Sequence, residues 1–459
     1  MIHPMLAQKL KKLSQTKNIA GIQKLCSSIH PVRVADALAK FSPQHIAEIL
    51  SVIKPRMRAA IFSYLAQPKQ TNLVEFLKRK TLIEMVAYMP ADRRVDFFNQ
   101  LPAASQELLL PALAHAEREN ILKLAAYPPE TAGAVMTSDY ATLFADLTTS
   151  EAIAKLRREA PDRETIYYTY VVDADRRLIG FVSLKDLILA NSDRRVADIM
   201  HQDVIRCAVT DDQEEAALKI QKYDLIALPV VNKDNILVGI ITHDDAIDIF
   251  AQEHTEDMEK LMAITGSHDH FSYMRTTVWT HFKNRSGWIF ILALLGLVSG
   301  YIVQNFSALL FQISIIASFI PMLTDTGGNT GSQAATLVVR ALAVNEITPR
   351  ETWVVLLKEA KVAILLGILL GIFSFARVVL FGWNVSIPEG LSLAAIGTAI
   401  AIAMGLQVIT ATLIGALLPL AAAKLKLDPA VVASPTLTTV VDITGLLIFF
   451  VTIKMFLGI

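Results

Sequence analysis

Hydrophobic residues near the N-terminus recur with the period of a helix. Between about Val32 and Ala126 they stand at i, i+3, i+4 and i+7 in short segments such as ALAKFSPQHIAEILSVI and RMRAAIFSYL. Polar turns separate the segments, and prolines stand at the turns or at first helical positions. This pattern predicts short amphipathic helices that stack as a small solenoid or bundle. Nothing in the region suggests a catalytic site.

The segment YPPETAGAVMT (127–137) ends this rhythm, and a helix–strand–strand–helix pattern then occurs twice. The strands are predicted in YYTYVVDADRRLIGFVSL before the helix KDLILA, and in IALPVVNKDNILVGIIT before the helix HDDAIDIFAQ. A repeat of roughly 60 residues predicts two stacked copies of one α/β unit. We place the copies at about 131–197 and 198–255, with VADIM opening the second as GAVMT opens the first.

Beyond residue 285 polar residues become rare, and five apolar stretches follow. Each has the roughly 20 apolar residues that cross a bilayer. The stretches lie near 287–310, 312–342, 353–381, 391–422 and 430–457. Basic residues are absent from the connections near 304–307 and 382–390. They occur in the other connections as Arg340, Arg350, Lys358, Lys361, Lys424 and Lys426. The positive-inside rule therefore predicts a multi-pass protein of a cell (inner) membrane, with the N-terminus cytoplasmic and the C-terminus extracytoplasmic.

Charge and cysteine content restrict the function classes. The formal net charge is zero, which gives no reason to expect nucleic acid as a partner. Cys26 and Cys207 show no pairing pattern, which fits a reducing compartment. The N-terminal MIHPMLAQKLKKL has no apolar run behind its lysines, so we expect no secretory signal and a cytoplasmic soluble part.

The predicted fold is therefore multi-domain. We expect an all-α superhelical N-domain (1–130), an α/β pair (131–255), a connecting helix (256–284) and an α-helical membrane domain with five transmembrane helices (285–459).

Two polar features interrupt the membrane domain. PMLTDTGGNTGSQ (321–333) brings acidic, amide and glycine residues to membrane depth, where a loosened backbone must be buried in protein or line water. Asp442 is the one acid in the apolar run 430–456. We interpret both segments as walls of an ion path. Because five helices make a thin wall, a pore on a two-fold axis of a homodimer is favoured.

Other chemistry is less well supported by these segments. Asp325-Thr326-Gly327 with Asp442 could supply the two carboxylates of an aspartic protease, but no substrate-gating acid motif accompanies the pair. GGNTG lacks the Gly-Lys-Ser/Thr of a phosphate-binding loop. His268, His270 and His281 are irregularly spaced. We therefore interpret these histidines as residues at the membrane interface and not as a metal cluster.

Acidic residues gather where the second α/β copy leads into the connecting helix. Like charges three and four residues apart weaken a helix unless cations lie between them, and Mg²⁺ or Ca²⁺ prefers such oxygen ligands. A solvated charged face is the alternative. The acids are Asp244, Asp245, Asp248, Glu253, Glu256, Asp257 and Glu259.

The two α/β copies resemble a pair of cystathionine β-synthase-type (CBS) modules, and the whole order of domains resembles the MgtE family of magnesium channels. The most specific parts are PMLTDTGGNTGSQAATLVVRALA (321–343) and DPAVVASPTLTTVVDITGLLIFF (428–450). The resemblance implies a passive, magnesium-selective channel in a lipid bilayer and no enzymatic activity. It also implies a pore lined by the second and fifth spans of two chains, with Asp442 as the main cation site.

The resemblance implies further pore residues. Gly327, Gly328 and Asn329 would form a pore-lining turn, and Gly445 would make a helix contact beside the site. Mg²⁺ gives up its waters reluctantly, so Asp442, Thr438 and Thr439 would hold it hydrated. Asp325 adds a carboxylate where the family often has none, and Thr412 stands where a polar amide is expected.

The family also uses cytoplasmic acids as a Mg²⁺ sensor that closes the pore, and reopens it by electrostatic repulsion when Mg²⁺ falls. Arg93 and Arg94 follow Asp92, one of these acids, at positions where the family usually has a more acidic helix. CBS pairs often bind adenosyl nucleotides, so ATP is a possible ligand, without assigned residues. Alternatives are a membrane-tethered cation or nucleotide sensor without transport, and a channel for another divalent cation such as Co²⁺. The sensing positions are Asp92, Asp96, Asp245, Asp248, Glu253, Glu256 and Asp257.

Overall fold

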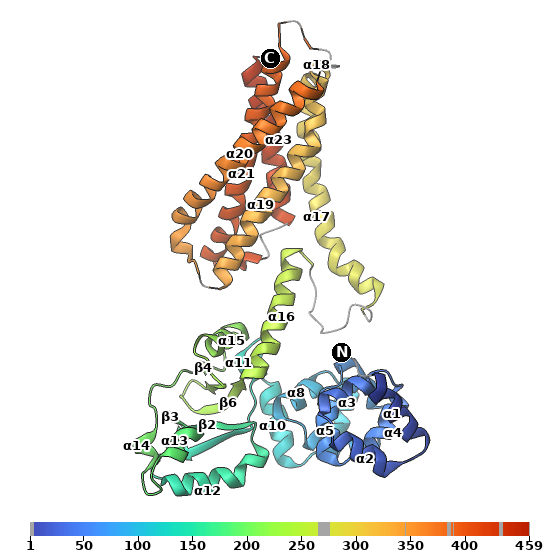
Figure 1. Ribbon diagram of the computed structural model, residues 1–459, viewed down its shortest axis with the longest axis vertical. Helices are drawn as coiled ribbons and strands as arrows, with labels where there is room; N and C mark the ends of the chain where they lie inside the picture. The colour runs from blue at the N-terminus through green and yellow to red at the C-terminus, as the bar shows by residue number, and fades with distance from the viewer. Residues whose placement is uncertain are drawn as a thin grey trace. The chain divides into compact units, whose positions relative to one another are not determined.

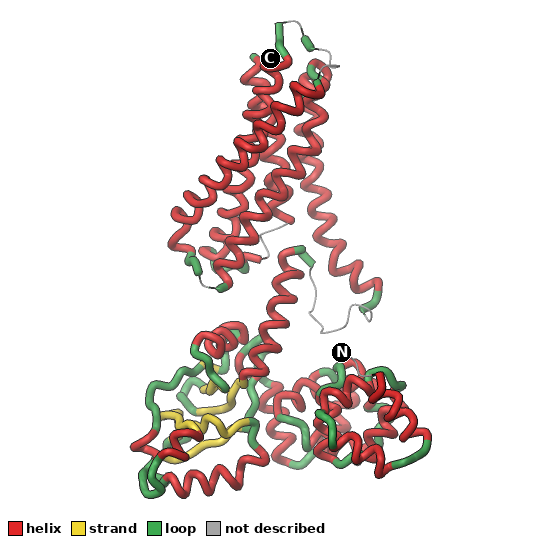
Figure 2. The backbone as a smooth tube through the Cα atoms, in the orientation of Figure 1, coloured by secondary structure: helices red, strands yellow, loops and turns green. Residues whose placement is uncertain are grey.

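The computed structural model describes residues 4–264, 276–344, 346–382, 387–388, 390–430 and 435–458. They form two compact units, Met1–Glu253 and His254–Ile459. Figure 1 labels the elements and Figure 2 separates helices from strands by colour.

The first unit begins with a domain of short helices, as the apolar period predicted. The helices are α1 (Pro4–Gln15), α2 (Ile19–Ser27), α3 (Pro31–Leu38), α4 (Pro43–Val52), α5 (Pro55–Ser63), α6 (Gln67–Leu73), α7 (Arg79–Ala87), α8 (Ala91–Asn99), α9 (Ala103–Leu109), η1 (Leu110–Ala112) and α10 (His115–Ala125). Proline begins α3, α4 and α5, where its missing N–H costs nothing. The buried rings of Phe62 and Phe97 pack edge to face, with centroids 5.1 Å apart.

Buried arginines tie successive helices of this domain together. The Arg58 guanidinium on α5 donates to the carbonyl oxygens of Leu50 and Ile53 at the end of α4. Arg94 on α8 repeats this arrangement, with hydrogen bonds of 3.0 and 2.8 Å to the carbonyl oxygens of Val86 and Met89 at the end of α7. Arg94 therefore satisfies buried backbone carbonyls at the end of α7 that have no partner within that helix.

The two α/β copies follow, each with a three-stranded sheet. The first contains α11 (Ala132–Val135), β1 (Tyr140–Phe144), α12 (Thr149–Glu159), η2 (Ala160–Asp162), β2 (Thr165–Val172), β3 (Leu178–Ser183) and α13 (Leu184–Leu189). The second contains α14 (Val196–Ile199), β4 (Cys207–Ala208), α15 (Gln213–Lys222), β5 (Ala227–Val231), β6 (Leu237–Thr242) and the start of α16 (His243–Leu261). The strands β1 and β4 were not predicted, because each is short and stands apart from its antiparallel partners.

Both sheets share one topology, and the copies pack against each other. The strand orders are β1-β2-β3 and β4-β5-β6, with the first pair parallel and the second antiparallel in each sheet. The Tyr140 and Tyr170 hydroxyls of the first copy donate to the carbonyl oxygens of Leu237 and Ala227 of the second, at 2.9 and 3.0 Å. A continuous buried cluster also joins the second copy to the helical domain.

The helix α16 carries the predicted run of acids without interruption from His243 to Leu261. The expected connecting helix of 256–284 is not one element in the part described, since α16 ends at Leu261 and α17 starts at Val278. His268 and His270 lie outside the described residues.

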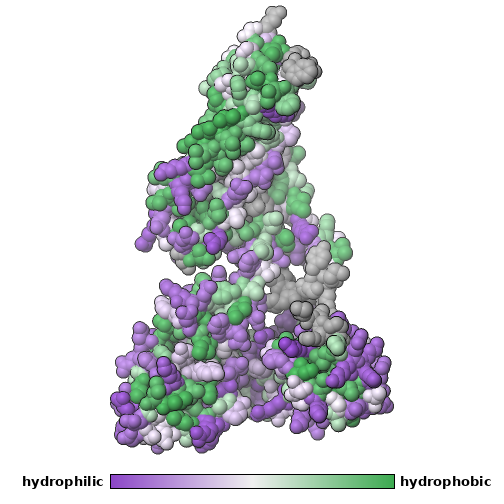
Figure 3. All heavy atoms as spheres, viewed as in Figure 1, coloured by the Kyte–Doolittle hydropathy of each residue, from purple (hydrophilic) through white to green (hydrophobic). Residues whose placement is uncertain are grey.

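The second unit is helical and mainly apolar on the face seen in Figure 3. Its elements are α17 (Val278–Asn305), α18 (Ser307–Gln312), η3 (Ser314–Phe319), α19 (Ile320–Ala343), η4 (Pro349–Glu351), α20 (Thr352–Phe381), α21 (Leu393–Lys424) and α23 (Pro435–Leu457). Four of the described helices, α17, α20, α21 and α23, are long and apolar enough to cross a membrane. The fifth expected span, α19, has 24 residues, which is sufficient in length at about 1.5 Å per residue, but its polar side chains keep it outside that group.

The turn predicted within 321–333 is wrong, because this segment is continuous α-helix. Pro321 stands in the first turn, where it is tolerated. The Thr326 and Thr330 hydroxyls bond back to the carbonyl oxygens of Met322 and Thr326 at 2.7 and 2.9 Å, so they are satisfied inside the helix. The glycines serve close packing and not a turn.

Candidate cation sites

Glycines bring α19, α21 and α23 into close contact. A Cβ built on Gly415 of α21 would fall on the carbonyl oxygen of Gly331 in α19. A Cβ on Gly327 would overlap the side-chain amide of Gln407 and lie 3.0 Å from the Val441 side chain of α23. Small residues of this kind allow membrane helices to approach backbone to backbone. The three helices therefore form the packed centre of the second unit.

Asp442 lies on α23 beside this contact. Its side chain is half-buried, and its Oδ1 atom is buried with no hydrogen-bond partner among the described residues. Thr438, one turn earlier, faces Gly328, and a Cβ on Gly445 would lie 3.0 Å from the Gln407 side chain. Thr439 is half-buried on the same helix. A carboxylate oxygen left without a donor in an apolar helix calls for a proton or a cation.

The other predicted pore residues divide between two faces of α19. Gly327 and Gly328 are buried against the neighbouring helices, whereas Asp325 and Asn329 are exposed. The Asn329 side-chain amide donates to Asp325 Oδ1 at 3.2 Å. Gln333 and Thr336 continue the same exposed face one and two turns on. We call Asp325, Asn329, Gln333 and Thr336 the polar stripe of α19.

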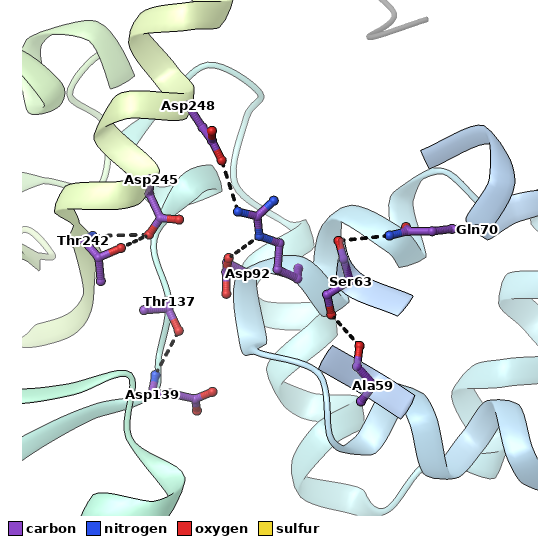
Figure 4. Close-up of polar contacts among 10 residues, drawn as sticks. Ala59, Ser63, Gln70, Asp92, Thr137, Asp139, Thr242, Asp245 and Asp248 are labelled. Carbon is purple, nitrogen blue, oxygen red and sulfur yellow. Dashed lines mark hydrogen bonds and ion pairs between the residues drawn. The ribbon is translucent and has the colours of Figure 1, made fainter. Parts of the chain in front are cut away.

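In the first unit, acids from α8 and α16 face one another. Figure 4 shows Asp245 and Asp248 of α16 pointing toward Asp92, in the first turn of α8. Arg93 lies between them: its Nη2 is 3.1 Å from Asp248 Oδ2 and its Nε is 3.5 Å from Asp92 Oδ2. Asp245 accepts hydrogen bonds from the backbone and hydroxyl of Thr242, which fix it at the start of α16. A side-chain cation thus stands where a metal ion was expected.

Burial and mutual repulsion disfavour ionisation of the acids in this cluster. Burial, followed by the charges of Asp245 and Glu164, raises the pKa of Asp92 to about 8, although Arg93 acts in the opposite sense. Burial also raises the pKa of Glu164 and of Asp245, and neighbouring carboxylates add to both shifts. Burial disfavours the charge of Arg93, but Asp92 and the acids of α16 outweigh it and raise its pKa. The cluster can therefore take up more positive charge.

The far end of α16 carries a second tethered cation, within the second unit. Lys260 Nζ lies 2.6 Å from Glu256 Oε1 and 3.0 Å from Oδ2 of Asp428, a residue that follows α21 in sequence. Burial and the charge of Asp428 raise the pKa of Asp257. Leu261 packs against the cluster of α19, α21 and α23 residues that includes Val441. The end of α16 therefore reaches the helices that carry Asp442.

Two further expected sensing residues lie near the first cluster, and the charge of Asp96 adds to the raised pKa of Asp92. Glu253 accepts a hydrogen bond from the Gln213 side chain of α15, and Asp96 is exposed on α8. Within the described ranges, no three His, Cys, Asp or Glu side chains converge closely enough to hold a metal ion by themselves.

Comparison with known proteins places the chain in a family. Three family models match: "MgtE intracellular N domain" over 29–130, "CBS domain" over 132–193 and 196–252, and "Divalent cation transporter" over 320–452. The magnesium transporter MgtE of Thermus thermophilus is 39% identical over 332 residues, covering 72% of this chain and 71% of that protein. The chain belongs to the MgtE family. The MgtE of Enterococcus faecalis is 34% identical over 341 residues, covering 74% of this chain and 72% of that one.

Two solved structures of MgtE-type proteins resemble the soluble part. The soluble part of a magnesium transporter has a TM-score of 0.52 and 30% identity, covering 54% of this chain and 98% of its own. The cytosolic domain of the Mg²⁺ channel MgtE in complex with ATP has a TM-score of 0.51 and 32% identity, covering 53% and 99%. Membership of this transporter family confirms the predicted order of helical domain, CBS pair and helical membrane domain, and the expectation that the chain is not an enzyme.

Residues of this MgtE chain that the sequence interpretation missed lie at both sites. An amide was expected near Thr412, whose hydroxyl instead bonds back to the Val408 carbonyl oxygen at 2.8 Å. Gln407 is the amide of α21: it is 1% exposed, and its Oε1 has no partner in the described part of the chain. It is the one amide in Leu393–Lys424, and this was the available signal. Glu164 had no such signal, because it comes from a loop distant in sequence.

Proposed function

We propose that this chain conducts Mg²⁺ passively across a cell membrane as a homodimeric channel, with the N-terminus cytoplasmic and the C-terminus outside. The observation that carries the proposal is the Asp442 carboxylate, half-buried in a helix long enough to span, with a buried oxygen that no described group satisfies. The related MgtE proteins, which are named magnesium transporters, support Mg²⁺ as the ion.

The chemistry of Asp442 suits a hydrated divalent ion. Two unpaired carboxylates facing each other across a dimer axis would repel, and one would hold a proton. A divalent cation between them removes that conflict. Because Mg²⁺ keeps most of its waters, one carboxylate from each chain is enough when hydroxyls such as that of Thr438 accept from the waters.

The polar stripe of α19 supports a second copy. Asp325, Asn329 and Gln333 are exposed on the single chain, on a helix packed among apolar spans. Contact of such side chains with lipid is costly, so in a membrane the stripe faces water or another chain. A two-fold axis beside α19 and α23 would place the polar stripe against a second chain or water and would bring the two Asp442 residues together.

We also propose that cytoplasmic Mg²⁺ closes this channel. Mg²⁺ binding among Asp92, Asp245 and Asp248, and near Glu256 and Asp257, would neutralise charge that otherwise drives α16 from its neighbours. The closed state would then be favoured by its higher ion affinity. The packing of Leu261 against the helices around Asp442 supports α16 as the element that blocks the path. An adenosine nucleotide such as ATP would bind at the CBS pair, as the ATP complex of the related cytosolic domain suggests.

Ion flux into liposomes tests the transport proposal. The purified chain should admit Mg²⁺, and Asp442→Asn should abolish this uptake while the elution volume of the dimer stays unchanged. Glu359→Gln, which removes a different carboxylate of a membrane helix, is the matched control and should retain flux. Parallel measurements with Co²⁺ and Ca²⁺ rank the ions.

The competing function is a membrane-tethered sensor. It predicts Mg²⁺ binding to the cytosolic part with no flux through the intact chain. Undiminished flux in Asp442→Asn would refute the pore assignment.

A further inference from the structure

A cavity of about 290 Å³ lies where η3 meets the end of α20, and neither proposed cation site uses it. Its lining combines two hydroxyls, one guanidinium and three apolar side chains. The lining residues are Ser314, Ile315, Ser318, Phe319, Arg377 and Phe381.

Arg377 of α20 is held in a fixed position in this cavity. Its Nη1 donates to the Ser318 carbonyl oxygen at 3.3 Å, and its Nη2 to the Ser318 hydroxyl at 3.2 Å. The guanidinium carbon lies 4.1 Å from the centroid of the Phe319 ring, which is fully buried. Stacking and hydrogen bonding together orient the guanidinium plane.

The charge of Arg377 has no counter-ion in the described part of the chain, where its polar contacts are those with Ser318. A guanidinium has five N–H donors, so several remain for an anion. A cation on an apolar membrane helix is costly unless an anion or the interface accommodates it. The cavity therefore offers a positive charge and N–H donors that an anionic group can bind.

The position along α20 identifies the source of that anion. Arg377 lies one turn before Phe381, the last residue of the helix. With 30 residues, α20 is about 45 Å long, which exceeds the roughly 30 Å hydrocarbon core, so its last turn reaches the headgroup layer. The neighbouring Leu380 and Phe381 side chains are 66% and 75% exposed and would face lipid.

We propose that this cavity binds the phosphate of a phospholipid headgroup. The proposal rests on the membrane placement given above and not on ion conduction. Arg377 pairs with the phosphate oxygens through its remaining N–H groups, and the Ser314 hydroxyl donates to the same group. Ile315 and Phe381 line the apolar side, where the glycerol backbone and the start of the acyl chains would lie.

Thermal unfolding of the full chain in detergent tests this proposal. Added phosphatidylglycerol should raise the unfolding temperature, whereas diacylglycerol, which lacks the phosphate, and inorganic phosphate, which lacks the lipid, should not. Arg377→Gln should weaken the apparent affinity for phosphatidylglycerol about tenfold or more, as expected for loss of a charge-assisted contact. Lys361→Gln, on the same helix, should leave it unchanged.

A second variant guards against misfolding of the first. Ser314→Trp fills the cavity and leaves the Arg377 contacts to Ser318 intact, and native mass spectrometry should show loss of one retained phospholipid per chain. An equal response of the Arg377→Gln variant and the parent chain overturns the proposal. So does an equal response to inorganic phosphate. Asp442→Asn should keep the lipid response, so failure of the pore and failure of this site are separable.

Discussion

Replacing Arg93 with glutamine should make docking of the helical domain on α16 depend on Mg²⁺. In the structure the guanidinium bridges Asp92 of α8 and Asp248 of α16, at 3.5 and 3.1 Å. Beside the buried cluster that joins the two parts, this bridge adds a charge contact between α8 and α16. When it is removed, the acids of the two helices face each other with nothing between them.

The magnitude follows from the exposure of the partners. The Asp248 side chain is 58% exposed, so its pair with Arg93 contributes no more than about 0.2–1 kcal/mol. The Asp92 side chain is only 14% exposed, so above about pH 8, where Asp92 is ionised, loss of its cation leaves a poorly solvated charge and costs about 1–2 kcal/mol. The sum is about 2 kcal/mol, or roughly a thirtyfold shift of the docking equilibrium.

Limited proteolysis and small-angle scattering of the cytosolic part, above about pH 8, measure this shift. In chelator the parent chain should remain compact, whereas Arg93→Gln should open and should close again as Mg²⁺ is added. Arg33→Gln, at an exposed position of α3, makes the same charge change and should behave as the parent chain. An Arg93→Gln variant that stays compact in chelator, or that opens and ignores Mg²⁺, would contradict the role assigned to Arg93.

Three further perturbations test other parts of the argument. Gly415→Ala should lower the unfolding temperature of the detergent-solubilised chain, because its methyl group meets the Gly331 carbonyl and overpacking costs about 1–3 kcal/mol. Gly296→Ala, with open space around it, should leave the unfolding temperature unchanged. Lys260→Gln should lower the Mg²⁺ concentration that half-closes the channel in flux assays, because Mg²⁺ then meets acids without a competing cation. The change should be about tenfold at most, since these acids are partly solvated, and an unchanged midpoint would contradict the competition. In chelator, the unfolding temperature of the cytosolic part should fall as pH rises from about 4 to 8. The unfolded chain releases the Asp92 proton near 3.8 and the folded chain keeps it to about 8, so the folded state binds more protons in this window. Asp92→Asn should therefore flatten the dependence of the unfolding temperature on pH.

The sequence alone was sufficient to predict the elements whose apolar pattern extends over many residues or is repeated along the chain. Helices of the N-terminal domain, both α/β copies and the acid-bearing α16 follow from apolar spacing and internal repetition, which are local properties. The isolation of Asp442 in an apolar run was equally visible. Its surroundings were not, because they depend on α19 and α21, which only the folded helices bring together.

The glycines of the second unit show where local reasoning failed. Gly327 and Gly328 were interpreted as part of a turn, since glycine weakens an isolated helix. Gly327 and Gly331 also have the four-residue spacing that lets membrane helices approach closely. In the structure the cost is offset by packing, because Gly331 receives the backbone of Gly415. The pair Gly296 and Gly300 has the same spacing, yet nothing lies within 4 Å of either position. Spacing alone cannot distinguish the two cases, because the partner helix decides.

The distribution of cations among the acids separates the two kinds of site. At each end of α16 a side-chain cation, Arg93 or Lys260, already neutralises part of the carboxylate charge. A Mg²⁺ ion that binds there gains less than it would from bare acids, which favours weak binding that can report a changing concentration. Asp442 has no such partner among the described residues. Its carboxylate must take its cation from solution, and that requirement suits a conducting path and not a resident structural ion.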